Sequence, residues 1–204
     1  MTPRSKLLEK RPDLHVVSGM IEPKARVLDL GCGDGAFLKM LTEDKDISGL
    51  GLEVSQQRII ECIDNGVPVV HADLNERLFF DDNSFDCVVL SRTLQAVERP
   101  DQVLREMLRI GKRGIISFIN IGYWQARLQL ALFGQMPITS TLPHTWFDTP
   151  NIHLATIKDF RSLCERLNIK IVEEKPIGNY SDFIAGLAPN LLAPNCVFLL
   201  EKKR

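Results

Sequence analysis

The sequence predicts a single α/β domain over residues 1–204, built on a mostly parallel β-sheet with helices on both faces. Two observations predict this class. Short β-type runs alternate with segments of helical periodicity along most of the chain, which is typical of βαβ units. The first of these units carries a glycine-rich turn, residues 31–35, between its strand and its helix. A chain of 204 residues is long enough to give one such domain a sizeable core.

The composition is that of a globular protein and argues against several classes of site. Basic and acidic residues number 25 and 26, so a formal net charge of -1 gives no overall attraction to nucleic acid or membrane. The cysteines form no C-x-x-C pair, which predicts neither a metal site nor a disulfide framework. Residues 1–13 are polar, and no run of about 18 apolar residues occurs. We therefore expect a cytoplasmic protein without a membrane segment.

The first half of the chain predicts three strands separated by helices. The expected strands are residues 26–30, 48–53 and 67–71. The expected helices are residues 14–21, residues 36–41 and a segment that follows Ser55. Pro68 cannot donate a hydrogen bond to a neighbouring strand, so we expect residues 67–71 at the edge of the sheet.

The helix after Ser55 has a predicted buried face and a predicted end. Ser55 is a suitable N-cap residue, and Ile59, Ile60 and Ile63 are expected to face the core. Asn65-Gly66 should end the helix, because glycine tolerates the left-handed backbone found at such ends.

The second half continues the alternation until about residue 120. Further strands are expected over residues 85–90, 114–119, 169–173 and 196–200. A helix with Val103, Leu104, Met107 and Leu108 on its buried face should end at Gly111. A second helix should begin with a capping box formed by Thr156 and Asp159. Residues 120–154 break the rhythm, and we interpret them as an insertion that packs over the sheet.

The glycine loop VLDLGCGDG (residues 27–35) is the sharpest local signal. Glycines there allow a tight turn and close approach of a ligand to a helix N-terminus. Gly31, Gly33 and Ala36 also satisfy the G-x-G-x-x-G/A pattern of dinucleotide sites. Asp29 and Asp34 would repel a pyrophosphate, since like charges about 5 Å apart at an effective dielectric near 20 cost roughly 3 kcal/mol. S-adenosylmethionine (SAM) carries an ammonium and a sulfonium, so the acids favour it over NAD.

Residues at the ends of later strands complete a predicted cofactor site. Glu53 lies 20 residues beyond Gly33, where a carboxylate can accept both ribose hydroxyls. Asp73 could accept a hydrogen bond from the adenine amino group, with Leu74 against the ring. Both acids could instead be ordinary solvated or turn residues. The predicted cofactor-binding set is Asp29, Gly31, Cys32, Gly33, Gly35, Glu53, Val54, Asp73, Leu74 and Ser91.

These motifs resemble the class I SAM-dependent methyltransferases, through VLDLGCGDG, LGLEVS (50–55), ADL (72–74) and DNSFDCVVLS (82–91). More narrowly, the chain resembles the methionine biosynthesis protein MetW family. That resemblance extends over about residues 11–201 and rests on LSRTLQAVERP (90–100), REMLRIGKRGIISF (105–118), GYWQARLQL (122–130), MPITSTLP (136–143) and TWFDTPNIHLATIKDF (145–160). One departure is Tyr123, which stands where the family usually has histidine, so a role of that histidine is not carried over.

The resemblance implies a Rossmann-like, seven-stranded sheet with a reversed last strand. It also implies Glu53 on the ribose of SAM, Asp73 on the adenine and the Gly31–Gly35 loop on the methionyl group, with S-adenosylhomocysteine as product or analogue. Finally, it implies homoserine O-acyltransferase as a partner. Nothing in the composition or the spacing indicates that partner.

Residues for a second substrate are less clear. No Asn-Pro-Pro-Tyr motif follows the fourth strand and no Pro-Cys nucleophile occurs, so methylation of nucleic-acid amines or cytosine carbon is not indicated. Cys32 is interpreted as a close-packed residue. Candidate residues for an acceptor or partner are Tyr123, Arg127, His144, Trp146, Asp148 and His153. His144 or His153 could act as a base, but Tyr123 and Trp146 are more often packing residues and histidines more often have structural roles. Arg127 could simply be solvated or paired, and no catalytic base is identified.

Three functions therefore stay open. The protein could sense SAM and pass that state to a partner enzyme, which we favour because no catalytic constellation is visible. It could instead transfer the methyl group of SAM to a small acceptor beneath the insertion. A nicotinamide-dependent oxidoreductase would require Asp29 to face away from the ligand.

Overall fold

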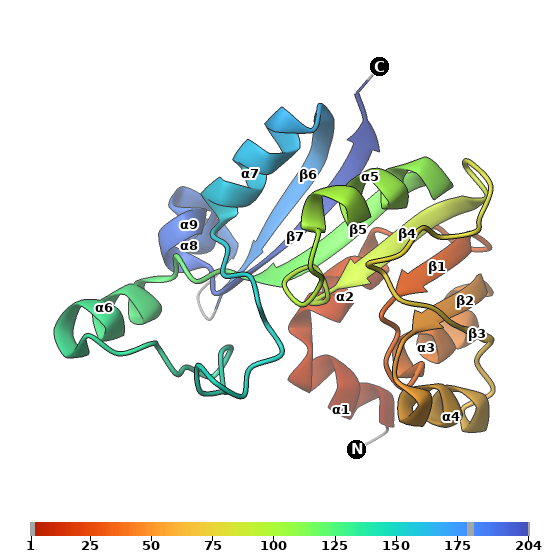
Figure 1. The fold of residues 1–204 in the computed structure, drawn as a ribbon, viewed down its shortest axis with the longest axis horizontal. Helices are drawn as coiled ribbons and strands as arrows, with labels where there is room; N and C mark the ends of the chain where they lie inside the picture. The colour runs from red at the N-terminus through yellow and green to blue at the C-terminus, as the bar shows by residue number, and fades with distance from the viewer. Residues whose placement is uncertain (1–2, 179–181, 204) are drawn as a thin grey trace.

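The protein forms one seven-stranded sheet with helices on both faces in a computed structural model that describes residues 3–178 and 182–203 (Figure 1). The strands are β1 (Arg26–Leu30), β2 (Ser48–Glu53), β3 (Val69–His71), β4 (Phe85–Ser91), β5 (Gly111–Ile119), β6 (Ile169–Ile177) and β7 (Asn195–Lys202). The helices are α1 (Pro3–Lys10), α2 (Pro12–Gly19), α3 (Ala36–Lys45), α4 (Gln56–Asp64), α5 (Pro100–Ile110), α6 (Trp124–Phe133), α7 (Ile157–Arg166), α8 (Asp182–Leu187) and α9 (Pro189–Leu192).

The strand order is β3-β2-β1-β4-β5-β7-β6. The first five strands are parallel, and β7 runs antiparallel to both of its neighbours, β5 and β6. The prediction of a mostly parallel sheet with a reversed last strand is confirmed, and so is the position of β3 at the edge. The order reverses direction between β1 and β4, and in open α/β sheets ligands bind at the carboxyl ends of the strands beside such a point.

Two apolar clusters hold the helices to the sheet. On one face, α5 and α7 pack against alternate residues of the central strands, among them Leu28, Val88 and Phe118. On the other face, α2 and α3 pack against the intervening residues, among them Val27 and Val89. Successive strand residues point to opposite faces, so Asp29 points to the same face as Val27, toward α2 and α3. A carboxylate at that position is necessarily buried.

The helix α4 corrects one prediction. Ile60 and Ile63 were expected to face the core, but their side chains are 59% and 63% exposed, and Cys62 is the fully buried residue of this helix. Cys62 packs beneath the glycine loop, where its thiol donates to the carbonyl of Gly33 at 3.1 Å. The loop thus determines which face of α4 is turned inward, and the isoleucine spacing was a misleading signal.

The ends of several helices and strands can also be compared with the sequence-based expectations. The capping box of α7 is present, with Thr156 and Asp159 each accepting from the other's backbone N–H. Strand β6 continues to Ile177, four residues beyond the predicted end. Helices α1, α6, α8 and α9 were not predicted individually. Among the described residues, no helix is both long and apolar enough to cross a bilayer.

The capping box provides a test of the fold. Thr156→Ala removes the oxygen that accepts from the Asp159 N–H, so the free energy of unfolding should fall by about 1 kcal/mol. The midpoint of thermal unfolding should fall by about 3 °C. Thr156→Ser keeps the hydroxyl and should remain within a few tenths of a kcal/mol of the parent. Equal losses in the two variants would show that packing of the threonine methyl, rather than capping, stabilises α7.

Candidate functional site

The glycine loop joins β1 to α3 at the carboxyl edge of the sheet. Gly31, Gly33 and Gly35 have φ angles of 78°, 60° and 74°, a left-handed conformation that other residues rarely adopt. A Cβ on Gly31 would lie 2.8 Å from the side chain of Thr93, and one on Gly35 would lie 2.9 Å from the thiol of Cys62. A Cβ on Gly33 would meet nothing within 4 Å. Packing therefore requires the outer two glycines, whereas the middle one leaves open space beside its backbone.

Glu53, at the end of β2, is fixed against this loop. One of its carboxylate oxygens accepts from the N–H of Gly33 at 2.9 Å, and the other accepts from Val54 and Ser55 at 3.0 Å each. Two carboxylate oxygens have about four lone-pair sites, so Glu53 retains capacity for a ligand. Its position is set by three backbone donors rather than by solvent.

Asp29 is the least satisfied acid at this edge. Its side chain is 4% exposed, and Oδ1 finds no hydrogen-bond partner in the described part of the chain. Burial raises the pKa of Asp29 to about 7, with Glu53 adding to the rise and Arg11 opposing it. A buried acceptor without a partner destabilises a fold.

A second buried group was missed in the sequence. Asp13, at the start of α2, has no exposed surface and accepts from Arg11 at 2.9 and 2.8 Å and from Ser117 at 2.7 Å. It also pairs with Arg92 at 3.2 Å. Burial alone would raise the pKa of Asp13, but these partners, chiefly Arg11, hold it below its usual value. One signal was available, because Asp13 precedes Val17 by one helical turn and so lies on the apolar face of α2.

Two hollows open at this edge, and they share Gly31 and Glu53. The Asp29 hollow is lined by Arg11, Asp29, Cys32, Gly33, Glu53 and Ser91, among others. The Asp73 hollow is lined by Glu53, Val54, Asp73, Leu74, Arg92 and Thr93, among others. Of the ten residues predicted to bind the cofactor, nine thus line one hollow or the other. The tenth, Gly35, is the N-cap residue of α3.

Two predicted residues also have structural roles. One oxygen of Asp73 accepts from the backbone and the side chain of Asn75, at 2.9 and 3.0 Å, which is the contact of an ordinary turn aspartate. Cys32 is buried, its sulfur lies 3.7 Å from that of Cys62, and burial raises the pKa of its thiol. Cys32 therefore packs as a neutral thiol against Cys62.

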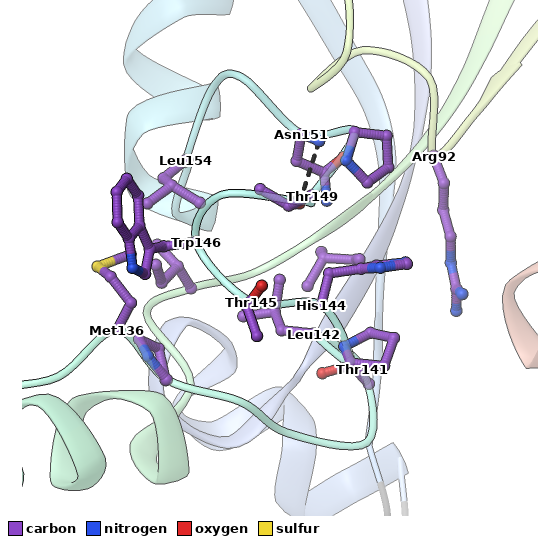
Figure 2. Close-up of a pocket in the computed structure, with 15 residues that line it drawn as sticks. Arg92, Met136, Thr141, Leu142, His144, Thr145, Trp146, Thr149, Asn151 and Leu154 are labelled. Carbon is purple, nitrogen blue, oxygen red and sulfur yellow. Dashed lines mark hydrogen bonds between the residues drawn. The ribbon is translucent and has the colours of Figure 1, made fainter.

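A third cavity lies between the insertion and the carboxyl end of β5. This insertion pocket is lined by Arg92, Ile119, Met136, Leu142, His144 and Trp146, among others (Figure 2). Arg92 lines both this pocket and the Asp73 hollow. Arg92 directly follows β4 and has a φ angle of 58°, unusual for a residue other than glycine.

Of the six candidate residues for an acceptor or partner, His144 and Trp146 line the insertion pocket. The other four have different surroundings. Tyr123 is buried, and its ring packs edge-on against Trp124. Arg127 donates to the carbonyl of Gly122 at 2.5 Å. Asp148 accepts from Thr145 at 2.8 Å, and a ring nitrogen of His153 lies 3.3 Å from the carbonyl of Glu98. Within the described ranges, no cluster of three metal-ligating side chains occurs.

Most of the insertion is exposed. Helix α6 projects away from the sheet, and residues 134–154 return beside the strand ends (Figure 1). We call the apolar residues of the insertion that are at least 40% exposed the insertion surface. They are Leu128, Leu130, Leu132, Phe133, Met136, Ile138, Trp146, Phe147, Ile152 and Leu154. A helix that is apolar on most sides is normally buried against another element.

Known proteins resemble this chain in sequence and in fold. The family model for "Methionine biosynthesis protein MetW" matches residues 11–200. A bifunctional methionine biosynthesis protein MetXA/MetW from Rhodopirellula baltica is 38% identical over 172 residues, which cover 79% of this chain. The matched part is only 28% of that protein's length.

Two solved structures show the same fold at low identity. A SAM-dependent methyltransferase from Thermotoga maritima superposes with a TM-score of 0.68 and 18% identity, covering 96% of this chain and 90% of the other. A SAM-dependent methyltransferase from Mesorhizobium loti superposes with a TM-score of 0.68 and 21% sequence identity. The superposition covers 94% of this chain and 96% of the other. The fold is therefore that of the class I SAM-dependent methyltransferases. Together with the match over residues 11–200, this shows that the chain belongs to the methionine biosynthesis protein MetW family.

Proposed function

We propose that the protein binds SAM at the carboxyl edge of its sheet and acts as a SAM-responsive subunit of a homoserine O-acyltransferase. SAM binding is supported by the charge distribution of the Asp29 hollow. Asp29, with its unpartnered oxygen, and Arg11 line the same cavity. An amino acid presents an ammonium and a carboxylate, and these two side chains match that pair of opposite charges.

The remaining groups suit the nucleoside of SAM. Glu53 lines both hollows and keeps unused acceptor capacity, as a residue that binds ribose hydroxyls must. Asp73 has one oxygen left beyond its contacts with Asn75, and Leu74 offers an apolar surface for an adenine ring. The open space at Gly33 lets a ligand lie against the backbone. When bound, SAM supplies an electrophilic methyl group and a positive charge.

A dinucleotide fits this edge poorly. A pyrophosphate in the Asp29 hollow would face Asp29, Asp34 and Glu53. An oxidoreductase would require Asp29 to point elsewhere, whereas its side chain lines this hollow. The same acids favour a ligand that carries a positive charge.

Two observations support homoserine O-acyltransferase as the partner: the composition of a relative and the exposed insertion surface. The Rhodopirellula baltica protein is described as MetXA and MetW in one chain, which suggests that the corresponding separate proteins associate. The insertion surface is the apolar area available for such a contact, with Phe133 70% and Leu132 66% exposed. Exposed apolar patches of this kind mark interaction sites.

Methyl transfer to a small acceptor is a second candidate function. Arg92 lines both the insertion pocket and the Asp73 hollow, so an acceptor in the pocket would lie beside the proposed cofactor site. His144 is the side chain of the pocket that could remove a proton from an acceptor. Formation of S-adenosylhomocysteine by the purified protein would favour this function over pure sensing.

Glu53→Gln tests the ribose contact. The amide would place an NH2 group against backbone N–H donors and would lose the charge, so the affinity for SAM should fall roughly 10- to 100-fold. Glu165→Gln makes the same chemical change at an exposed position on α7 and should bind like the parent. Calorimetric titration measures both. Parent-like affinity in Glu53→Gln would refute the assignment of Glu53.

Asp29→Asn tests the ammonium contact through stability as well as binding. Because folding raises the pKa of Asp29 to about 7, the folded protein keeps a proton that the unfolded chain releases from about pH 4 upward. The ligand-free parent should therefore lose stability relative to Asp29→Asn as the pH rises from 5 to 8, in thermal unfolding. At pH 8 the variant should bind SAM roughly tenfold or more weakly. A stability difference that does not change with pH would show that Asp29 is not buried in this way.

Phe133→Ser tests the partner surface. Loss of this ring should weaken association with the organism's homoserine O-acyltransferase roughly tenfold or more, measured with the two purified proteins. SAM affinity should not change, because Phe133 lies outside both hollows. Phe79→Ser is the matched control, since Phe79 is 97% exposed but lies between β3 and β4. Equal effects of the two substitutions, or no association at all, would contradict the assignment.

A further inference from the structure

The insertion pocket has a chemical character that neither SAM binding nor an apolar protein contact explains. It is a cavity of about 210 Å3, a size that suits a small molecule. Most of its lining is apolar, including Ile119, Met136, Leu142 and Trp146. None of the described residues that line it is Asp or Glu, although acids line both hollows of the proposed SAM site. The charge in this pocket comes from Arg92, with His144 as a further ionisable group.

Arg92 is held in place by unusual local structure. Its backbone is left-handed, with a φ angle of 58°, and its N–H donates to the carbonyl of Ser117 at 2.9 Å. Residues other than glycine keep such conformations where the surrounding structure enforces them, often at ligand sites. Arg92 thus stands at the carboxyl end of β4, where it lines both the Asp73 hollow and the insertion pocket.

The guanidinium of Arg92 is incompletely neutralised. Its single ion pair in the described structure is to Asp13, at 3.2 Å, and Asp13 also pairs with Arg11 at 2.8 Å. Two arginines therefore share one carboxylate, and a positive charge is left over. In addition, Nε of Arg92 is buried and finds no acceptor among the residues that the structure describes. Arg11 opens into the Asp29 hollow, so Arg92 is the arginine that can offer its charge to the insertion pocket.

The pocket has a polar end and an apolar end. In Figure 2, the ring of His144 points toward the side where Arg92 lies, while Trp146 and Met136 lie together on the opposite side. A ligand that satisfies both ends must carry an anionic head and an apolar body. Guanidinium groups bind carboxylates with two parallel hydrogen bonds.

We propose that the insertion pocket binds a small monocarboxylate with an apolar body, with its carboxylate on Arg92 and its body toward Trp146 and Met136. The proposal goes beyond SAM binding and stands independently of it. Among the described residues, the insertion pocket shares Arg92 alone with the Asp73 hollow, and the insertion pocket shares no lining residue with the Asp29 hollow. It makes the protein a receptor for two ligands in adjoining cavities.

The test compares two ligands of the same shape. Hexanoate and hexanamide are titrated calorimetrically into the parent protein at pH 7.5, without SAM. Hexanoate should bind roughly tenfold or more tightly than hexanamide, because only the carboxylate carries charge to Arg92. Arg92→Met should abolish this preference, and Arg92→Lys, which retains the charge for Asp13 but lacks the planar fork, should reduce it. Equal binding of the two ligands by the parent, or no binding of hexanoate, would overturn the proposal.

A second pair of variants does not depend on Arg92 and its ion pair. Met136→Glu places a negative charge in a pocket without acids, and Met136→Gln adds a polar group of the same size. Hexanoate affinity should fall roughly tenfold further in the glutamate variant than in the glutamine variant. SAM affinity should be the same in both, because Met136 lies outside both hollows. Equal hexanoate affinities in the two variants would also overturn the proposal.

Discussion

The buried carboxylate of Asp29 is the constraint on which the organisation of the site depends. Strand alternation turns Asp29 into the apolar layer between the sheet and the helices α2 and α3, and its backbone leads directly into the glycine loop. The loop can turn sharply there because glycine has no Cβ: at Gly31 a Cβ would clash with Thr93, and at Gly35 it would clash with Cys62. Glu53 is then fixed by the N–H of Gly33. The geometry leaves Asp29 buried, with no partner for its Oδ1 among the described residues, which costs stability.

The first helices and the strand ends act as one electrostatic unit. Asp13 connects α2 to β4 and β5 through Ser91 and Ser117, and it brings Arg11 and Arg92 to two different cavities. A single carboxylate thus pairs with both arginines. These contacts tie the N-terminal helix α2 to the strand ends where the three cavities open.

Features set by local spacing were predictable from the sequence, and features set by distant contacts were not. The glycine loop, Glu53 and Asp73 follow strands directly, so counting residues from each strand placed them at one edge. Thr156 and Asp159 form a cap within one turn. By contrast, Asp13 meets Ser91 across 78 positions in the chain, and no local pattern reveals that pairing. The exposure of Ile60 and Ile63 likewise depends on Cys62 fitting beneath a loop that precedes it by 29 positions. The left-handed backbone at Arg92 was not predictable either, because no glycine occupies that position.

Calorimetric titration with SAM at pH 7, in two buffers of different ionisation enthalpy, tests the role of Asp29. Such a pair of titrations measures the affinity and the net number of protons released. Burial raises the pKa of Asp29 to about 7, so part of the ligand-free protein holds a proton on Asp29 at this pH, and an ammonium would displace it. We predict binding of SAM and S-adenosylhomocysteine but not of NAD, with release of a fraction of a proton that disappears in Asp29→Asn. Binding of NAD in place of SAM, or SAM binding without proton release, would contradict the central role given to Asp29.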